Sequence, residues 1–349
     1  ANDAVLVYCS CVGALVAPVT DALAGDPVQL ENVVHGQAGI TQTPGQTVIE
    51  LGHQAVLEFS RFDIPEEYLV QFVQPDATSR VLNRVLSNDP SRINGQLLAN
   101  GQVYLINPAG VIFGSNAVID ASRFYSAAAR MTDSDFLNGI DRLVSDGGSV
   151  INEGVISAAD GVHLFGSYVE NNGVIIASDG LVTLTSGDEV LIGQPGSDVY
   201  LRVDGLDAHT GHGASGGGAD TDEVGVSNSG AVRAQEIMFA AGDVYSLALR
   251  NMGSATAEGG RVTMAGNGLV DHAGLIDVSD SEGVGGEASL LGDRVSMTGG
   301  VIDASGREGG GRVRVGGDRQ GDDAGFGSCH GRGPCTLTRV DRPLVRRLG

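Results

Sequence analysis

The stretch that decides the fold runs from Asn83 to Gly114 and reads NRVLSNDPSRINGQLLANGQVYLINPAGVIFG. It contains two short apolar runs, Gln102 to Ile106 and Val111 to Phe113, whose composition is typical of β-strands. Turn residues bound these runs at Asn100-Gly101 and at 107–110, where the letters are NPAG. Short strands joined by tight turns indicate a β-rich scaffold, and the pattern does not indicate catalysis.

A loosely repeated phrase follows, from residue 147 onward. It consists of a polar residue, often Asn, then any residue, then Gly, then an apolar run. Successive glycines of the phrase are 19, 57, 23, 21 and 26 residues apart, which fits coils of about 19 to 26 residues, with coils missed between Gly173 and Gly230. The glycines are Gly154, Gly173, Gly230, Gly253, Gly274 and Gly300.

Each unit carries a second strand in which apolar and polar residues alternate, so that one set points inward and the other outward. Coils of such strands predict an all-β fold, a right-handed parallel β-helix, because one coil cannot bury its own apolar face but stacked coils share a core. We expect roughly eight coils between residues 147 and 318. The alternating strands are 162–165, 181–184, 237–240, 261–264, 288–291 and 312–315.

A β-sandwich is the structural alternative, since it also needs many short strands, but it does not require a repeated phrase at near-constant spacing. A helix is expected in one place only, from Asp120 to Met131, where the sequence is rich in alanine. The composition agrees with a turn-rich β-protein, because 54 Gly, no Trp and 5% aromatic residues are unusual for a helical or α/β enzyme.

The chain is strongly acidic, with a formal net charge of −22, and all 21 of its basic residues are Arg. Such a surface repels phosphate backbones, so we expect no nucleic acid partner, whereas solubility is favoured.

The two ends of the chain differ in character from the middle. Residues 1–24 have the pattern of a signal peptide remnant, with an apolar run from Ala4 to Val19 and a small-residue cleavage site at 22–24. A membrane anchor is the alternative, although these 16 residues are fewer than the roughly 20 that span a bilayer. Residues 326–349 form a basic, atypical tail that is expected to belong to another module or to be a translation artefact; its Cys329 and Cys335 could pair outside the cytoplasm.

The stretch from Asn83 to Gly114 resembles the N-terminal two-partner secretion domain of the filamentous haemagglutinin and high-molecular-weight-adhesin family. In that family an Asn-Pro-Asn-Gly turn follows an NGQV-aromatic-LI strand, and this chain departs from it by placing Ala109 at the second Asn. The resemblance extends from about Pro27 to Gly193. It includes the segments 47–50, 55–62, 70–75, 135–139 and 150–156.

The resemblance implies an N-terminal β cap and first coils at 25–146. The repeated phrase extends the β-helix over 147–325, and the Gly-rich segment 207–222, which breaks the repeat, is expected to project as a loop. It implies a secreted, adhesin-like passenger of a bacterium with two membranes, exported through an outer-membrane transporter, with a host-cell or bacterial surface receptor as a further partner. No catalytic residue, metal or cofactor is implied.

In the family this turn matters for recognition and export by the transporter. Carried over to this chain, the transporter-recognition or turn motif comprises Asn107, Pro108, Gly110 and Val111. Proline presets φ in a turn, glycine accepts a positive φ, and the Asn side chain can bond the backbone two residues further on. The same chemistry fits a purely structural turn, so recognition and folding both stay open as roles.

A β-helical carbohydrate-active enzyme, a polysaccharide lyase or glycoside hydrolase, is the alternative function and requires clustered carboxylates on one face. Asp277 and Asp303 occupy equivalent repeat positions and could stack, but many other Asp residues adjoin Gly, as turn residues do. Formal dinucleotide and nucleophile-elbow patterns at 211–216 and 213–217 lack the required strand and helix. The seven His residues show no metal-ligand spacing. A toxin-delivery protein whose effector lies beyond these residues is a third possibility.

Overall fold

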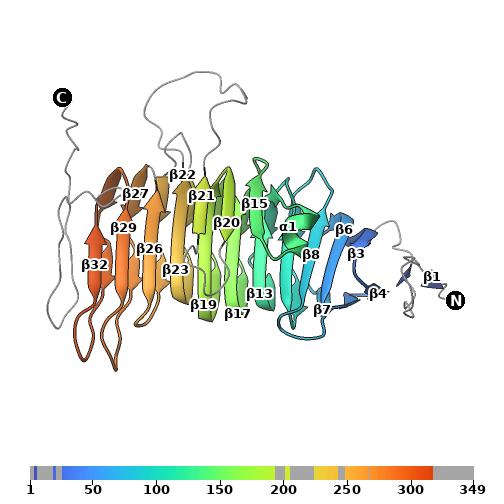
Figure 1. Ribbon diagram of the computed structural model, residues 1–349, viewed down its shortest axis with the longest axis horizontal. Helices are drawn as coiled ribbons and strands as arrows, with labels where there is room; N and C mark the ends of the chain where they lie inside the picture. Colours follow the sequence, from blue (N-terminus) through green and yellow to red (C-terminus); the bar gives the residue numbers. More distant parts are fainter. Residues whose placement is uncertain are drawn as a thin grey trace, which may run out of the picture.

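The computed structural model describes residues 26–192, 201–204, 224–242, 248–266 and 268–316, together with the short strands β1 (Ala4–Val5) and β2 (Val19–Thr20). These residues form a rod of stacked strands with the N-terminal strands at one end (Figure 1). Within them, no helix is long and apolar enough to cross a membrane. Apart from β1 and β2, the predicted signal segment, the loop 207–222 and the basic tail with Cys329 and Cys335 lie outside the described residues.

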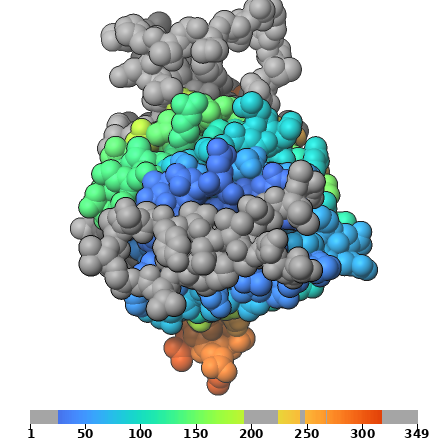
Figure 2. All heavy atoms as spheres, turned by 90° about the vertical axis from the view of Figure 1, so that its right-hand side faces the viewer, coloured from blue at the N-terminus to red at the C-terminus, as the bar shows by residue number. Residues whose placement is uncertain are grey.

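The predicted N-terminal cap is present and consists of antiparallel strands. Strand β3 (Val28–His35) pairs with β6 (Gln54–Phe62), and β4 (Ala38–Thr43) pairs with β5 (Gln46–Leu51). Figure 2, which looks onto this end, shows the cap as the blue residues lying across the rod. Because β5 and β6 then pair in parallel with later strands, the cap provides the hydrogen-bonding edge on which the first coil forms.

Parallel strands continue from this edge as a right-handed parallel β-helix, as the repeats predict. Strands β11 and β12 coincide with the two apolar runs recognised at 102–106 and 111–113. The largest sheet contains, after the cap, β7 (Leu69–Val73), β8 (Arg80–Val85), β10 (Gln96–Ala99), β11 (Gln102–Ile106), β13 (Val118–Ala127), β17 (Val155–Gly166), β19 (Val174–Gly187), β23 (Ala231–Gly242), β25 (Ser254–Thr256), β26 (Arg261–Gly266), β28 (Leu275–Asp277), β29 (Glu287–Leu291), β31 (Val301–Asp303) and β32 (Arg312–Val315). The second parallel sheet contains β9 (Ser91–Ile93), β12 (Val111–Phe113), β16 (Ser149–Asn152), β18 (Tyr168–Asn171), β22 (Val224–Asn228), β24 (Ala248–Asn251), β27 (Leu269–His272) and β30 (Arg294–Met297).

The prediction that coils are missed between Gly173 and Gly230 is wrong. Strand β19 pairs directly with β23, and β18 pairs directly with β22, so the two coils are neighbours. Part of the intervening chain leaves the helix: β20 (Glu189–Ile192) and β21 (Leu201–Asp204) join a separate antiparallel sheet with β14 (Ala129–Arg130) and β15 (Asp141–Ser145). Counting one coil for each of β16, β18, β22, β24, β27 and β30, the described residues after 147 form six coils and not eight.

The helix expected from Asp120 to Met131 is also wrong, because these residues form most of β13 and all of β14. Parallel pairing of β13 with β11 and β17 outweighs the helix propensity of alanine. The short helix of the described chain, α1 (Asp133–Leu137), follows directly, and the Thr132 hydroxyl caps it by accepting a bond from the Asp135 backbone N–H at 3.0 Å.

The interior of the rod is built from columns of equivalent side chains on successive coils, most of them apolar. One interior column is polar and consists of Asn152, Asn171, Asn228, Asn251 and His272, all fully buried. Each of the first three amides donates through Nδ2 to Oδ1 of the next, at 2.8, 2.7 and 2.8 Å. The column ends where His272 Nε2 lies 3.2 Å from the Val301 carbonyl oxygen. The polar residue of the repeated phrase is therefore a rung of a buried ladder, since buried polar groups require partners.

The repeated phrase contains glycine because adjacent coils approach each other closely at that position. A Cβ on Gly173 would lie 2.1 Å from the Gly154 carbonyl oxygen, and one on Gly230 would lie 2.1 Å from that of Gly173. Gly253 and Gly274 continue the same column with distances of 2.0 Å. Any side chain at these corners would push the coils apart. The regular spacing of glycine in the sequence therefore follows from the stacking of the backbones of successive coils.

Candidate functional site

The turn at 107–110 joins β11 to β12 and forms a corner of one coil. The Gly110 N–H donates to the Asn107 carbonyl oxygen at 2.9 Å, and the Ala109 N–H donates to Asn107 Oδ1 at 3.0 Å. The Asn107 N–H donates to the Ala127 carbonyl oxygen of the next coil at 3.0 Å. Pro108 occupies the position where its ring fixes a suitable φ. The turn chemistry expected from the sequence is therefore present.

The Asn107 side chain points into the rod and has no exposed surface. Its Nδ2 donates to the Asp89 carbonyl oxygen at 3.0 Å and to the Ser91 hydroxyl at 3.1 Å, both on the preceding coil. With Oδ1 engaged by Ala109, both polar atoms of the amide have partners. The side chain thus ties its own turn to the coil below.

Gly110 and Val111 are also held inside. Gly110 has a φ of +120°, and an added Cβ would lie 2.9 Å from the Ser149 carbonyl oxygen, so a side chain is excluded on both grounds. Its own carbonyl oxygen accepts from the Ser91 N–H at 3.0 Å. Val111 is fully buried and pairs in register with Ser91 and Val150.

The structure therefore brings the four predicted residues together but divides them by accessibility. Asn107, Gly110 and Val111 are buried, whereas Pro108 and Ala109 are partly exposed. A partner that meets the folded domain at this corner can touch only the Pro108-Ala109 tip. The sequence could not make this division because a turn motif does not specify which side of the coil it faces.

A second polar cluster, which the sequence analysis did not identify, lies outside the β-helix under the antiparallel sheet. The rings of Tyr104 and Tyr125 stack with centroids 4.0 Å apart. Their hydroxyls donate to the two carboxylate oxygens of Asp141 on β15, each at 2.9 Å. His163 lies against Tyr125 at 4.5 Å between centroids, and its Nδ1 is 3.0 Å from the Thr183 hydroxyl. The available signal was aromatic residues at outward positions of strands, which implies a cover.

Burial governs the titration of this cluster. It raises the pKa values of both tyrosines and raises the pKa of Asp141, although the tyrosine hydroxyls oppose the latter shift. It lowers the pKa of His163 to about 3, and the positive charge of Arg123 adds to this shift. The cluster lies between the β-helix and the antiparallel sheet, which covers it, so its hydrogen bonds hold this sheet against the rod.

One trio in the described chain has the side chains of a serine hydrolase but not the geometry. His53 Nδ1 lies 3.2 Å from the Ser79 hydroxyl and 3.4 Å from Asp76 Oδ2. A catalytic histidine uses its two nitrogens for the two partners, whereas here one nitrogen faces both. Ser79 already donates to Asp76 Oδ1 at 3.0 Å, and hydrogen bonds from Thr78 and Ser79 lower the pKa of Asp76. The trio is a turn closed by an aspartate.

The carboxylates considered for an enzyme form turns as well. Asp277 and Asp303 do stack, since they are register partners on β28 and β31. Each accepts a bond from the backbone N–H two residues on, from Ser279 at 3.0 Å and Ser305 at 2.9 Å. Across the described ranges, no group of three or more His, Cys, Asp or Glu is arranged to hold a metal ion. The patterns at 211–216 and 213–217 lie outside those ranges.

The capped parallel β-helix and the corner turn at 107–110 are the features expected of a two-partner secretion domain. The sequence model of the TPS secretion domain family matches residues 25–271. The chain belongs to this family and carries the secretion domain of a two-partner secretion passenger.

Relatives with curated descriptions and a solved structure agree with this assignment. A heme/hemopexin-binding protein of Haemophilus influenzae strain Rd is 35% identical over 158 residues, which cover 42% of this chain and 18% of that protein. A second heme/hemopexin-binding protein of Haemophilus influenzae is 33% identical over 119 residues, covering 34% and 12%. The chain thus spans less than a fifth of the length of these relatives. The crystal structure of the HMW1 secretion domain from Haemophilus influenzae superposes with a TM-score of 0.71 and 28% identity, over 84% of this chain and 78% of that one.

Proposed function

We propose that this chain directs the export of a longer, adhesin-like exoprotein through an outer-membrane transporter of the two-partner secretion class. The observation that carries the proposal is the match of the secretion domain family across the cap and most of the coils. The exported product would lie outside a bacterium with two membranes, at its surface or in the medium. A receptor on host cells or other bacteria is the expected target of the whole exoprotein.

The fold suits export of an unfolded chain. Each coil contacts chiefly its two neighbours, so coils can be added one at a time once the cap has formed. The antiparallel pairing of β3 with β6 and of β4 with β5 supplies an edge that precedes all coils in the sequence. Folding that begins at the cap and proceeds along the rod would oppose return of the chain through the transporter. The division of the chain at residue 146 stays a prediction.

For the turn at 107–110, the proposal assigns two roles. Asn107, Gly110 and Val111 act through folding, because their atoms are enclosed and bonded to the neighbouring coil. Pro108 and Ala109 provide the accessible tip that a partner can contact after folding.

The test is release of the chain into the medium by a Gram-negative host with and without the cognate transporter. We expect release only with the transporter. Asn107→Ala should lower both release and the free energy of unfolding, by about 1–3 kcal/mol because buried partners lose a hydrogen bond. Ser91→Ala is the matched control: it removes one partner of Asn107 without changing the turn, and its smaller loss of stability should bring a proportionally smaller loss of release.

The outcomes separate the two roles. If Asn107→Ala folds as stably as the wild type and still is not released, Asn107 is recognised directly and the folding role is wrong. Release without any transporter would overturn the export function itself.

A further inference from the structure

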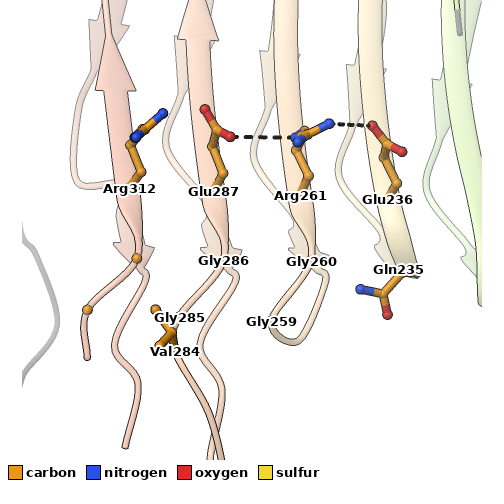
Figure 3. A pocket seen from close by; sticks show the side chains of 12 residues that line it. Gln235, Glu236, Gly259, Gly260, Arg261, Val284, Gly285, Gly286, Glu287 and Arg312 are labelled. Carbon is orange, nitrogen blue, oxygen red and sulfur yellow. Dashed lines mark hydrogen bonds and ion pairs between the residues drawn. The ribbon is translucent and has the colours of Figure 1, made fainter. Parts of the chain in front are cut away.

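A polar groove of about 760 Å³ crosses four successive coils in the half of the rod that the antiparallel sheet does not cover (Figure 3). Its lining repeats from coil to coil, because Glu236 in the middle of β23 is in register with Arg261, Glu287 and Arg312, the first residues of β26, β29 and β32. The groove therefore runs along the rod axis, across the strands. Its volume is in the range of small-molecule binding sites.

The floor of the groove is backbone. Gly260, Gly286 and Gly311 stack so closely that a Cβ on any of them would lie 2.0 Å from the carbonyl oxygen of the preceding coil. The N–H groups here are already engaged: Glu287 donates to Gly260 and Arg312 to Gly286, both at 2.9 Å. A peptide strand that needs free backbone donors would find none at these positions.

One wall is a ladder of alternating charges. Arg261 Nη1 lies 3.4 Å from Glu236 Oε1, and Arg261 Nε lies 3.7 Å from Glu287 Oε2. Arg314 reaches the other oxygen of Glu287 at 3.6 Å. Two acidic and two basic residues of the register column cancel, so this strip is neutral on a chain of net charge −22. It therefore offers donors and acceptors alternately, at the roughly 4.8 Å spacing of strands, without favouring an ion of either sign.

The other wall is formed by two long turns, 278–286 and 304–311, that lie beside one another through the bridges Asp280↔Gly306 and Val284↔Gly309. They project from the rod below β29 and β32 in Figure 1 and form the protrusion at the lower edge of Figure 2. Val284 lines the groove with 54% of its surface exposed, which supplies an apolar contact opposite the charged ladder.

We propose that this groove binds a neutral, hydroxyl-rich oligosaccharide laid along the rod axis. A sugar hydroxyl is both a donor and an acceptor, so it can donate to Glu236 or Glu287 and accept from Arg261. This dual capacity matches a wall on which acidic and basic side chains alternate. An extended, flat β-1,4-linked chain advances per sugar by about the coil spacing and turns over at each sugar, so every second sugar presents the same edge and meets a side chain of the same charge. The apolar face of a sugar ring can rest on Val284 and on the glycine floor. None of the lining residues is aromatic, so binding rests on hydrogen bonds and is weak.

The test measures binding of three neutral β-1,4-linked hexasaccharides, cellohexaose, chitohexaose and xylohexaose, to the whole chain by NMR titration or calorimetry. We expect at least one to bind with a Kd on the order of 1 mM or tighter. Arg261→Ala and Glu287→Gln should each weaken that binding at least about tenfold, while circular dichroism and the melting temperature stay near the wild type. Arg142→Ala is the control, since it breaks a similar exposed pair with Glu189 on the antiparallel sheet.

Three results would overturn the proposal: no binding of any hexasaccharide at 5-fold above that concentration, binding that both groove variants retain, or tighter binding of a heparin hexasaccharide, which would make the ligand anionic. The proposed export function rests on the cap and the turn at 107–110, which lie outside this groove, so Arg261→Ala should be released with the transporter as the wild type is. A failure of sugar binding with normal release therefore leaves the proposed function unaffected.

Discussion

The outer face of the largest sheet is covered in one half of the rod and open in the other, and the same column of positions passes through both. In the covered half the column presents Tyr104, Tyr125 and His163, stacked beneath β15. In the open half the register partners are Thr263, Ser289 and Arg314. The backbone is alike in both halves, so the chemistry of an outward residue is set by what lies over it.

The cover exists because the chain leaves the helix between two coils. Strand β20 emerges after β19 and pairs antiparallel with β15 on one side and with β21 on the other, while β23 resumes the stack on β19. The open half has instead the long turns at 278–286 and 304–311, which make a groove and not a lid. Additions to the turns thus diversify the surface without disturbing the core.

The largest effect is expected at the glycine column, because coils in both halves of the rod require close approach of their backbones there. Gly230→Ala places a Cβ 2.1 Å from the Gly173 carbonyl oxygen between two coils, and we expect a loss of about 3 kcal/mol or more in the free energy of unfolding. Urea denaturation measures it. Gly309→Ala is the control, because its Cβ would meet only Val284 Cγ2 at 4.0 Å, and it should change stability by less than about 0.5 kcal/mol. Equal losses in both variants would refute the stacking argument.

An intermediate effect is expected at the fastening of the cover. Asp141→Ala removes the acceptor of two buried tyrosine hydroxyls, which should cost about 2–4 kcal/mol. Amide hydrogen exchange should rise in β15 and β20 before it rises in β23. Asp146→Ala serves as the control, since it breaks an exposed pair with Arg130 whose contribution is about 0–1 kcal/mol. Uniform loss of protection along the whole rod would mean that the cover is not a separate unit.

The smallest effect is the pH dependence that the cover imposes on His163. Its pKa is 6.5 when unfolded and about 3 when folded, so the unfolded chain binds the proton first and stability falls as the pH drops below about 6.5. The slope approaches about 1.4 kcal/mol per pH unit. The raised pKa of Asp141 acts in the opposite sense, since its favourable protonation is lost as the pH rises through the folded value.

Comparing the unfolding free energies of the wild type and His163→Gln at pH 7, 6 and 5 isolates the histidine, because Asp141 is present in both. The wild type should lose about 1 kcal/mol more than the variant between pH 6 and 5. Parallel pH profiles of the two proteins would show that His163 is not buried as a neutral group. Burial also lowers the pKa of His272 in the interior column of the open half, but His272 is present in both proteins and its contribution cancels in the comparison.

Much of the candidate site was readable from the sequence, but its accessibility was not. The Asn-Pro-Ala-Gly letters predict the turn at 107–110 because Asn, Pro and Gly have local conformational preferences. That Asn107 points inward to Ser91, and that Ser149 excludes a side chain at Gly110, depends on the two neighbouring coils. The Tyr104, Tyr125 and Asp141 cluster was missed for the same reason, since its members come from three strands far apart in sequence.

The sequence by itself determined the parallel β-helix and the positions of most strands of its repeats, because a repeated Asn-x-Gly phrase and period-two alternation are local properties that every coil expresses. The cap was implied by the family resemblance of the N-terminal segments. Only the tertiary structure decided that Gly173 and Gly230 lie on adjacent coils, that the alanine-rich segment at 120–131 is a strand, and that the antiparallel sheet covers half of one face. Register between coils and the destination of an insertion are set by contacts between distant segments. No local pattern encodes such contacts, whereas backbone pairing and burial select them during packing.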